Sequence, residues 1–313
     1  MNKCALVVVF SVICLSFGRF SPTTEANRPI KDISNQLQLV STEKGNPVNF
    51  CGYAVPTYRK DVRQKLDRAI EPFLVSHSFT QKLRSRVAYY KKIVLPILKR
   101  NGIPEDFFYL GMAESGLDNL TSPKGAKGYW QFMETAAVRY GLEVSETVDE
   151  RMHLRKSTEA ACKYLLDSYD HYRSWPLVAA SYNMGITGLD NALMREGTRN
   201  YFELNINAET GNYLYRILAI KYVFEQPLRY GLRDKSVKRY NQPLSRYVKV
   251  DEDIEDLEAF AVAEGANLEA IQKLNPWLIA ENLKVLPGKK YEIKLPFEKI
   301  KETDQPLLVS VAE

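Results

Sequence analysis

The chain has 313 residues, of which 26% are charged and 45% hydrophobic, a balance typical of a folded globular protein. Its formal net charge of +5 is mild and does not form the concentrated basic stripe of a nucleic-acid-binding protein, so we expect no nucleic-acid partner. A mild positive charge still favours proximity to an anionic polymer or membrane surface. The three histidines are not clustered and no cysteine pair has zinc-ligand spacing, so we expect neither a metal nor a cofactor.

Residues 1–26 have the pattern of a signal peptide rather than of a folded element. A short positive region precedes the apolar run 5–17, and about 13 apolar residues are fewer than the roughly 20 that span a bilayer. Cleavage is expected after 16–18 or 24–26. Cys14 suggests a lipoprotein, but the residues before it lack the expected leucine and small residue. We therefore predict export to the periplasm or cell envelope without lipid anchoring.

Removal of the leader leaves two cysteines, Cys51 and Cys162. In an exported chain they could form one disulfide or stay free, and the sequence leaves both open. Residues 27–56 are polar and rich in turn residues, which predicts a linker or a loosely packed arm.

Helical periodicity dominates residues 57–240, and no sustained strand alternation occurs in the first 170 of them. We expect an all-α domain there. Capping residues and helix-breaking prolines and glycines predict five helices. They run from Thr80 to near Gly102, from Pro104 to Gly116, from Ser157 through Tyr172, from Ser174 to Gly185, and from Thr210 to Pro227.

The pattern changes after Pro243. Short strands are predicted at 247–250 and 291–295, with two short helices between them at 256–264 and 268–274. This βααβ pattern defines a small α+β module over 244–297. The charged residues 298–313 are expected to be a disordered tail.

One acid stands out in the second predicted helix. Glu114 follows Phe107, Leu110 and Gly111 on one stripe, and the other faces of this helix are hardly more polar. A carboxyl buried among apolar groups keeps its proton near neutral pH, as cleavage of a glycosidic bond requires. The alternative is a glutamate at a helix end that reaches solvent past Gly116.

Two further segments carry groups suited to a sugar chain. The loop Gly125–Gly128 allows close backbone approach, and Tyr129 and Trp130 offer flat faces. Gln131, expected on the helix that follows this loop, offers a donor and an acceptor. The alternative is a pair of loop glycines with two core aromatic residues.

A small-residue helix ends in a phenol and an amide, Tyr182 and Asn183. They could face a ligand, or be a core tyrosine followed by an asparagine at the helix end.

Together these segments resemble the lytic transglycosylases of the soluble-lytic-transglycosylase superfamily. The resemblance covers roughly residues 57–225. Its motifs are Gly102-Ile103-Pro104, Glu114-Ser115, Ser122 with Gly125-Ala126-x-Gly128-x-x-Gln131-Phe132-Met133, Tyr140-Gly141-Leu142, Tyr182-Asn183-x-Gly185 and Glu209-Thr210-x-x-Tyr213.

The resemblance implies a goose-type-lysozyme-like helical fold acting on peptidoglycan glycan strands. Glu114 would be the single catalytic acid and later the base, giving 1,6-anhydro ends without consuming water. Ser122, Gln131, Tyr182 and Asn183 would line the sugar subsites, and Tyr213 would approach Glu114.

Two other functions are also compatible with the sequence. A hydrolytic muramidase needs a second carboxylate, and the candidates near the motifs are Asp118, Glu134, Asp149 and Glu150, none of which stands out. A catalytically silent peptidoglycan-binding protein need not keep the acid at position 114.

The C-terminal module resembles a LysM domain through Tyr247-Val248, Leu274-Asn275-Pro276 and Tyr291-x-Ile293-x-Leu295-Pro296. That resemblance implies binding to a polymer containing N-acetylglucosamine. The stretch Val250–Asp253 departs from it, because the usual Gly-Asp-Thr turn is missing. We expect the protein to be a monomer.

Overall fold

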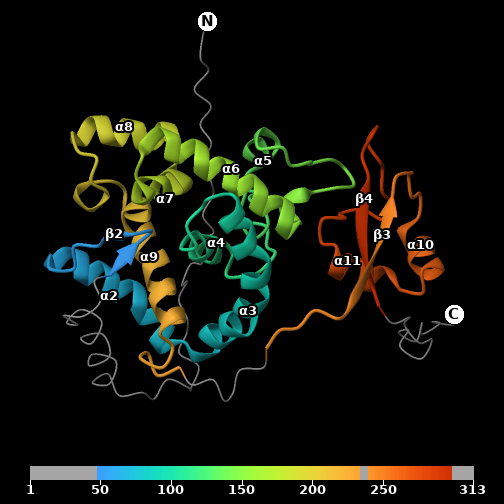
Figure 1. The fold of residues 1–313 in the computed structure, drawn as a ribbon, viewed down its shortest axis with the longest axis horizontal. Coiled ribbons are helices and arrows are strands. Elements are labelled where there is room, and N and C mark those ends of the chain that lie inside the picture. The colour runs from blue at the N-terminus through green and yellow to red at the C-terminus, as the bar shows by residue number, and fades with distance from the viewer. Residues whose placement is uncertain (1–47, 233–238, 298–313) are drawn as a thin grey trace, which may run out of the picture. The chain divides into compact units, whose positions relative to one another are not determined.

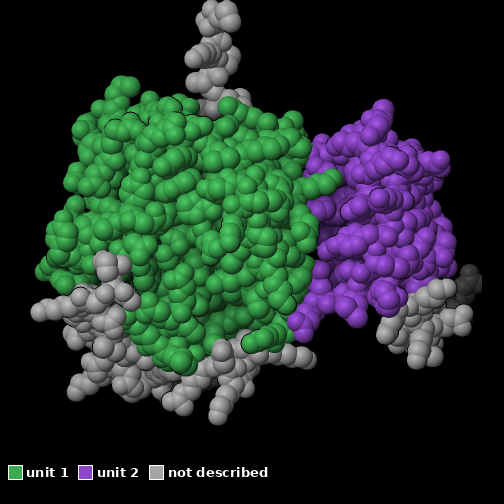
Figure 2. Space-filling model, in the orientation of Figure 1, with its two compact units in different colours: residues 1–142, 154–240 green, residues 143–153, 241–313 purple. Residues whose placement is uncertain are grey.

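The computed structural model describes residues 48–232 and 239–297, which form two compact units (Figure 2). Unit 1 comprises the described residues up to Leu142 together with Leu154–Tyr240, and unit 2 comprises Glu143–His153 and the described residues from Asn241 onward. The predicted leader, residues 27–47 of the predicted arm and the predicted tail lie outside the described residues.

Unit 1 is built almost entirely from helices, as predicted for residues 57–240 (Figure 1). Its helices are α2 (Lys60–Val75), α3 (His77–Arg100), α4 (Phe107–Ser115), α5 (Glu134–Arg139), α6 (Leu154–Tyr172), α7 (Trp175–Met184), α8 (Ile186–Glu196), the 3₁₀ turn η2 (Tyr201–Glu203) and α9 (Ala208–Glu225).

Helix α4 lies near the centre of unit 1, with α3 and α9 packed on either side of it (Figure 1). All nine of its residues are buried, as its uniformly apolar sequence predicted. Gly116 ends the helix in the left-handed conformation, with φ of 60°. The chain therefore turns sharply just after Glu114, and this acid stays inside the protein.

Several predicted helix limits were wrong. Helix α3 begins at His77 rather than Thr80, and α6 begins at Leu154. Ser157 is therefore not a cap: it is buried in the first turn of α6, where its hydroxyl donates to the carbonyl of Leu154 at 3.3 Å. Helices α2 and α8 were not predicted. The helix expected to carry Gln131 begins only at Glu134, as α5, so Gln131 lies in the loop before it.

The end of the predicted arm is not loosely packed. Strands β1 (Asn49–Phe50) and β2 (Tyr53–Ala54) form an antiparallel hairpin. Its turn residues Cys51 and Gly52 both have positive φ, as a tight two-residue turn requires. The Phe50 ring is fully buried and meets the ring of Phe107 edge-on at 5.5 Å, so the hairpin packs against the start of α4.

Unit 2 has the predicted βααβ order. It contains β3 (Ser245–Val250), α10 (Leu257–Ala263), α11 (Leu268–Leu274) and β4 (Tyr291–Pro296), together with the 3₁₀ turn η1 (Glu150–Met152). The strands pair antiparallel, with Val248 opposite Ile293. The mainly α fold class with a small α+β C-terminal region is thus confirmed.

Residues 143–153 complete the core of unit 2, although they lie about a hundred residues earlier in the sequence. Val148 is fully buried among the apolar side chains of this unit and forms a bridge with Leu278. The Asp149 amide donates to the Trp277 carbonyl at 2.9 Å. Glu143 accepts from Lys289 at 2.6 Å and from the Tyr291 hydroxyl at 2.8 Å. This unit is therefore not made from residues 244–297 alone.

Within the described ranges, no helix has the length and apolar character needed to cross a membrane. Cys51 and Cys162 are both free thiols, so the structure contains no disulfide between them.

Candidate functional site

Glu114 is the centre of a cluster of buried polar groups in unit 1. Its side chain has no solvent exposure, which rules out the alternative of a glutamate reaching solvent past Gly116. Burial raises the pKa of this carboxyl from 4.5 to about 7, against the opposing effects of the Arg216 charge and of the hydrogen bond from Tyr213. A carboxyl with such a pKa holds its proton in much of the population at neutral pH and can also release it.

Tyr213 on α9 is the hydrogen-bond partner of this acid. Its hydroxyl donates to Oε1 of Glu114, so the two residues meet although 99 positions separate them in the sequence. Burial and the neighbouring Glu114 carboxyl hold the pKa of Tyr213 well above its usual value, so the phenol remains a donor. The second oxygen, Oε2, is buried and makes no hydrogen bond with the described residues. Oε2 is therefore the oxygen free to exchange a proton with a ligand.

Gln131 sits at the end of the glycine-containing loop in a left-handed conformation, with φ of 50°. Such a φ is uncommon for a residue with a side chain. The side-chain nitrogen Nε2 of Gln131 holds this conformation by donating to the carbonyls of Gly128 at 2.8 Å and Leu120 at 3.0 Å. Its buried oxygen Oε1 makes no hydrogen bond within the described chain, so Gln131 offers an acceptor.

Tyr182 and Asn183 end helix α7, which packs against α9. The Tyr182 hydroxyl donates to the carbonyl of Trp130 at 2.7 Å and so fixes the residue before Gln131. The Asn183 oxygen accepts from the Thr210 hydroxyl at 2.7 Å, while its buried nitrogen Nδ2 has no partner among the described residues. Asn183 therefore offers a donor, and Tyr182 positions the loop.

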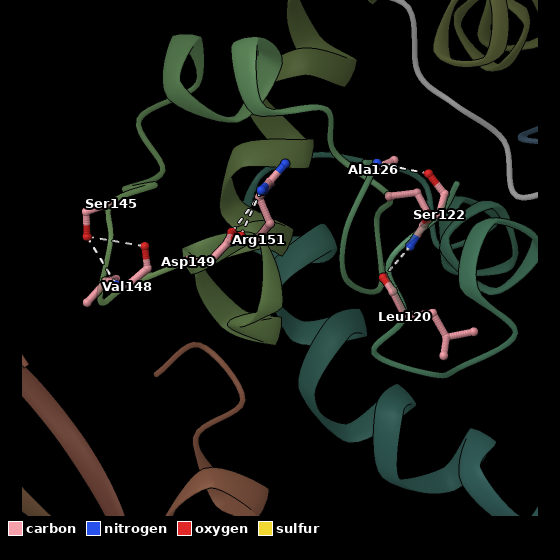
Figure 3. A network of polar contacts seen from close by, with 8 residues as sticks. Leu120, Ser122, Ala126, Ser145, Val148, Asp149 and Arg151 are labelled. Carbon is pink, nitrogen blue, oxygen red and sulfur yellow. Dashed lines mark hydrogen bonds and ion pairs between the residues drawn. The ribbon is translucent and has the colours of Figure 1, made fainter. Parts of the chain in front are cut away.

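Ser122 stabilises the loop before Gln131. Its hydroxyl oxygen accepts from the Ala126 amide at 2.9 Å (Figure 3). Its own amide donates to the Ala126 carbonyl at 2.8 Å. The side chain is 4% exposed. In the structure Ser122 thus shapes the loop, and its contact with a sugar stays a prediction.

The interpretation of Tyr129 and Trp130 as sugar-stacking faces was wrong. Both rings are buried, at 2% and 0% exposure. The Tyr129 ring stacks on Tyr90 and its hydroxyl donates to the Phe108 carbonyl at 2.8 Å. The Trp130 nitrogen donates to the Thr158 hydroxyl at 2.9 Å. These aromatic residues fill the core and support the loop.

The candidates for a second carboxylate already have structural partners or face solvent. Asp118 pairs with Arg86 at 2.8 Å; burial opposes its ionisation, but the bond and charge of Arg86 outweigh it and keep the pKa of Asp118 below its usual value. Asp149 forms a two-point ion pair with Arg151 (Figure 3). Glu150 accepts from the Glu143 amide at 2.9 Å, and Glu134 is exposed in the first turn of α5. None of these carboxyls lies among the groups whose charges shift the pKa of Glu114.

Sequence reasoning missed Arg216, which lies one helical turn after Tyr213 on α9. Its guanidinium carbon is 5.5 Å from the centre of the Tyr213 ring. Its nitrogens Nε and Nη2 are buried and make no hydrogen bond with the described part of the chain. The available signal was a single cation in the apolar stretch Leu214–Ile220.

Within the described residues, no group of three or more His, Cys, Asp or Glu side chains is placed to hold a metal ion. Glu114 on α4 and its neighbours on α7 and α9 offer proton transfer and hydrogen bonding, and Gln131 in the loop before α5 offers a further acceptor.

Comparison with protein families agrees with this arrangement. Residues 96–205 match the family model of the transglycosylase SLT domain, and residues 246–299 match that of the soluble lytic transglycosylase C-terminal LysM-like domain. Residues 96–205 are thus similar to an SLT transglycosylase domain, and residues 246–299 are similar to a LysM-like domain.

Among individual relatives, the chain is similar to membrane-bound lytic murein transglycosylase D of Escherichia coli K12, with 25% identity over 169 residues. The same protein of Escherichia coli O6:H1 matches equally. The match covers 52% of this chain and 37% of the relative, so the chain aligns with little more than a third of the length of these curated relatives.

Proposed function

We propose that the protein is a peptidoglycan lytic transglycosylase that acts in the cell envelope after export. It would cleave the β-1,4 bond between N-acetylmuramic acid and N-acetylglucosamine without consuming water. The observation that carries the proposal is the enclosed Glu114, whose pKa of about 7 suits both an acid and a base and whose Oε1 is held by Tyr213. The SLT domain match supports the same activity.

In the first step, protonated Glu114 donates its proton from Oε2 to the glycosidic oxygen. The bond from this oxygen to C1 of the muramic acid sugar breaks, and the N-acetylglucosamine end leaves as an alcohol. The N-acetyl oxygen of the muramic acid sugar stabilises the positive charge that develops at C1. Glu114 is left as a carboxylate, to which Tyr213 continues to donate a hydrogen bond.

In the second step, the Glu114 carboxylate takes the proton of the C6 hydroxyl of the same sugar. The freed O6 attacks C1 and closes a 1,6-anhydro ring, and Glu114 returns to its protonated state. One carboxyl therefore suffices, and the second carboxylate that a hydrolytic route needs is not required. Gln131 and Asn183 supply an unused acceptor and an unused donor for the sugar amide and hydroxyl groups. Because Glu114 is fully enclosed, the glycan must displace covering side chains to reach Oε2.

The LysM-like unit would provide a second contact with peptidoglycan. Here the acidic stretch that replaces the usual turn is anchored within the unit, because Asp253 accepts from the Val285 amide at 2.7 Å and from Lys284 at 3.1 Å. The substituted stretch therefore keeps a defined place in the unit although the usual turn is missing.

The test is mass spectrometry of purified peptidoglycan digested with protein lacking residues 1–26. We expect muropeptides that are one water lighter than hydrolytic products. Glu114→Gln should release none of them while still cosedimenting with insoluble peptidoglycan, whereas the matched control Glu134→Gln should behave like wild type. Reducing-end products would identify a muramidase instead, and binding without any release by the wild type would identify a silent binding protein.

A further inference from the structure

The guanidinium of Arg216 is only partly satisfied by the fold. Two of its nitrogens are buried without a hydrogen-bond partner in the described chain. Arg216 as a whole is half-buried, but guanidinium nitrogens withdrawn from water are costly unless an acceptor or an opposite charge compensates them. The α9 positions one turn away from Arg216 are Asn212, Tyr213, Ala219 and Ile220. None of these is a carboxyl that could compensate the cation.

The geometry around Arg216 leads to Glu114. Tyr213 and Arg216 are three residues apart and so share a face of α9. The guanidinium lies over the Tyr213 ring, and the hydroxyl of that ring donates to Glu114 Oε1. Glu114 Oε2 is the buried acceptor without a partner, and Arg216 carries the buried donors without a partner. Tyr213 therefore contacts both Arg216, through its ring, and Glu114, through its hydroxyl.

The other groups that face Glu114 do not replace this cation. Tyr182 from α7 is neutral, because its burial and the nearby Glu114 carboxyl hold its pKa well above the usual value. Glu209, also on α9, is negative and opposes ionisation of Glu114. Tyr213 is a neutral donor. Among the groups whose influence on Glu114 is resolved, Arg216 alone carries a positive charge.

We propose that Arg216 is a positioning residue for the reaction, whose fixed positive charge stabilises the Glu114 carboxylate during the stage in which Glu114 acts as base. This inference rests on the proposed two-step function. In that sequence the enclosed acid must become an anion after the first proton transfer. The Arg216 charge lies where it favours this anion, and the aromatic ring of Tyr213 keeps the guanidinium in place.

The experiment compares Arg216→Gln, which removes the charge, with Arg216→Lys, which keeps it. Arg139→Gln is the matched control, because Arg139 also lies over a tyrosine ring, that of Tyr140 at 5.8 Å, away from Glu114. The pH dependence of kcat/KM for anhydro-product release is measured for each variant. In Arg216→Gln the loss of activity at alkaline pH should move upward by on the order of half a pH unit or more, with kcat reduced and KM little changed. Arg216→Lys and Arg139→Gln should keep the wild-type profile.

A second measurement does not depend on turnover. The infrared spectrum of the Glu114→Gln variant is subtracted from that of the protein with Glu114, which isolates the carboxyl band of Glu114. This band is titrated twice, once with Arg216 present and once in the Arg216→Gln variant. The inference requires Glu114 to keep its proton to higher pH without Arg216, even if the protein proves to have no lytic activity. An unchanged titration overturns it. A raised KM with an unchanged titration would also overturn it, by making Arg216 a binding group for a substrate carboxylate.

Discussion

Replacement of Glu114 by glutamine should change the pH dependence of stability as well as activity. The folded protein holds this carboxyl at a pKa of about 7, against 4.5 for an ordinary glutamate. Each pKa unit corresponds to about 1.4 kcal/mol, so the shift of about 2.5 units amounts to roughly 3 kcal/mol of unfolding free energy. The group has no solvent exposure, so no correction for solvent screening applies.

Stability falls as pH rises because the folded state holds the proton more tightly than the unfolded state. Between pH 4.5 and 7 the folded chain keeps a proton on Glu114 that the unfolded chain releases. The wild type therefore loses stability as pH rises through this window, and the loss is complete above about pH 8. Glutamine does not titrate, so Glu114→Gln escapes the loss. Relative to the wild type, the variant should gain about 3 kcal/mol between pH 4 and pH 8, whatever its constant offset.

Urea unfolding followed by tryptophan fluorescence measures this difference. Of the three tryptophans, Trp277 belongs to unit 2, so Trp277→Phe in both proteins leaves a signal from unit 1 only. Glu134→Gln removes a carboxyl from the exposed start of α5 and controls for the loss of one negative charge. If the difference between Glu114→Gln and the wild type stays constant from pH 4 to pH 8, Glu114 titrates as an ordinary exposed acid, and the burial argument fails.

Three further predictions concern the support of the site. Tyr213→Phe removes the bond to Glu114 that lowers the acid's pKa, so the alkaline limb of the pH–rate profile should move upward and kcat should fall about 10- to 100-fold. Gly111→Ala should destabilise unit 1 by about 1–3 kcal/mol in urea unfolding, because a Cβ there would clash with the Tyr129 ring. Val148→Ala should loosen the core of unit 2 by on the order of 1–3 kcal/mol, seen as faster hydrogen exchange in β3 and β4 but not in α4.

For each of these three variants a different result would contradict the prediction. A Tyr213→Phe profile identical to that of the wild type would mean that the hydrogen bond does not act on the acid. Gly188→Ala is the control for Gly111→Ala: its Cβ would meet Met184 at an ordinary 3.7 Å, so alanine should stabilise α8 by up to about 1 kcal/mol through helix propensity. Equal stabilisation at both glycines would refute the steric argument. Exchange that rises equally in both units would refute the assignment of Val148 to unit 2.

The sequence by itself determined the fold class and the position of the acid. Proline, glycine and the apolar period are local signals, and they correctly ended α4 at Gly116 and α9 before Pro227. The uniformly apolar composition of α4 correctly indicated a core helix, although it left the burial of Glu114 open. The βααβ order of the C-terminal region also followed from short local patterns.

The family resemblance had implied the contact of Tyr213 with Glu114, but only the tertiary structure decided most of the other contacts. An aromatic residue that fills a core and one that stacks on a sugar look the same in sequence, and burial assigned Tyr129 and Trp130 to the core. Residues 143–153 joined unit 2 because Val148 finds its apolar neighbours there, a contact that no local period encodes. Arg216 became a candidate only when its unpaired nitrogens were seen beside Tyr213 and its acid. Such contacts depend on which side chains exclude water together across long stretches of chain, and local propensity carries no information about them.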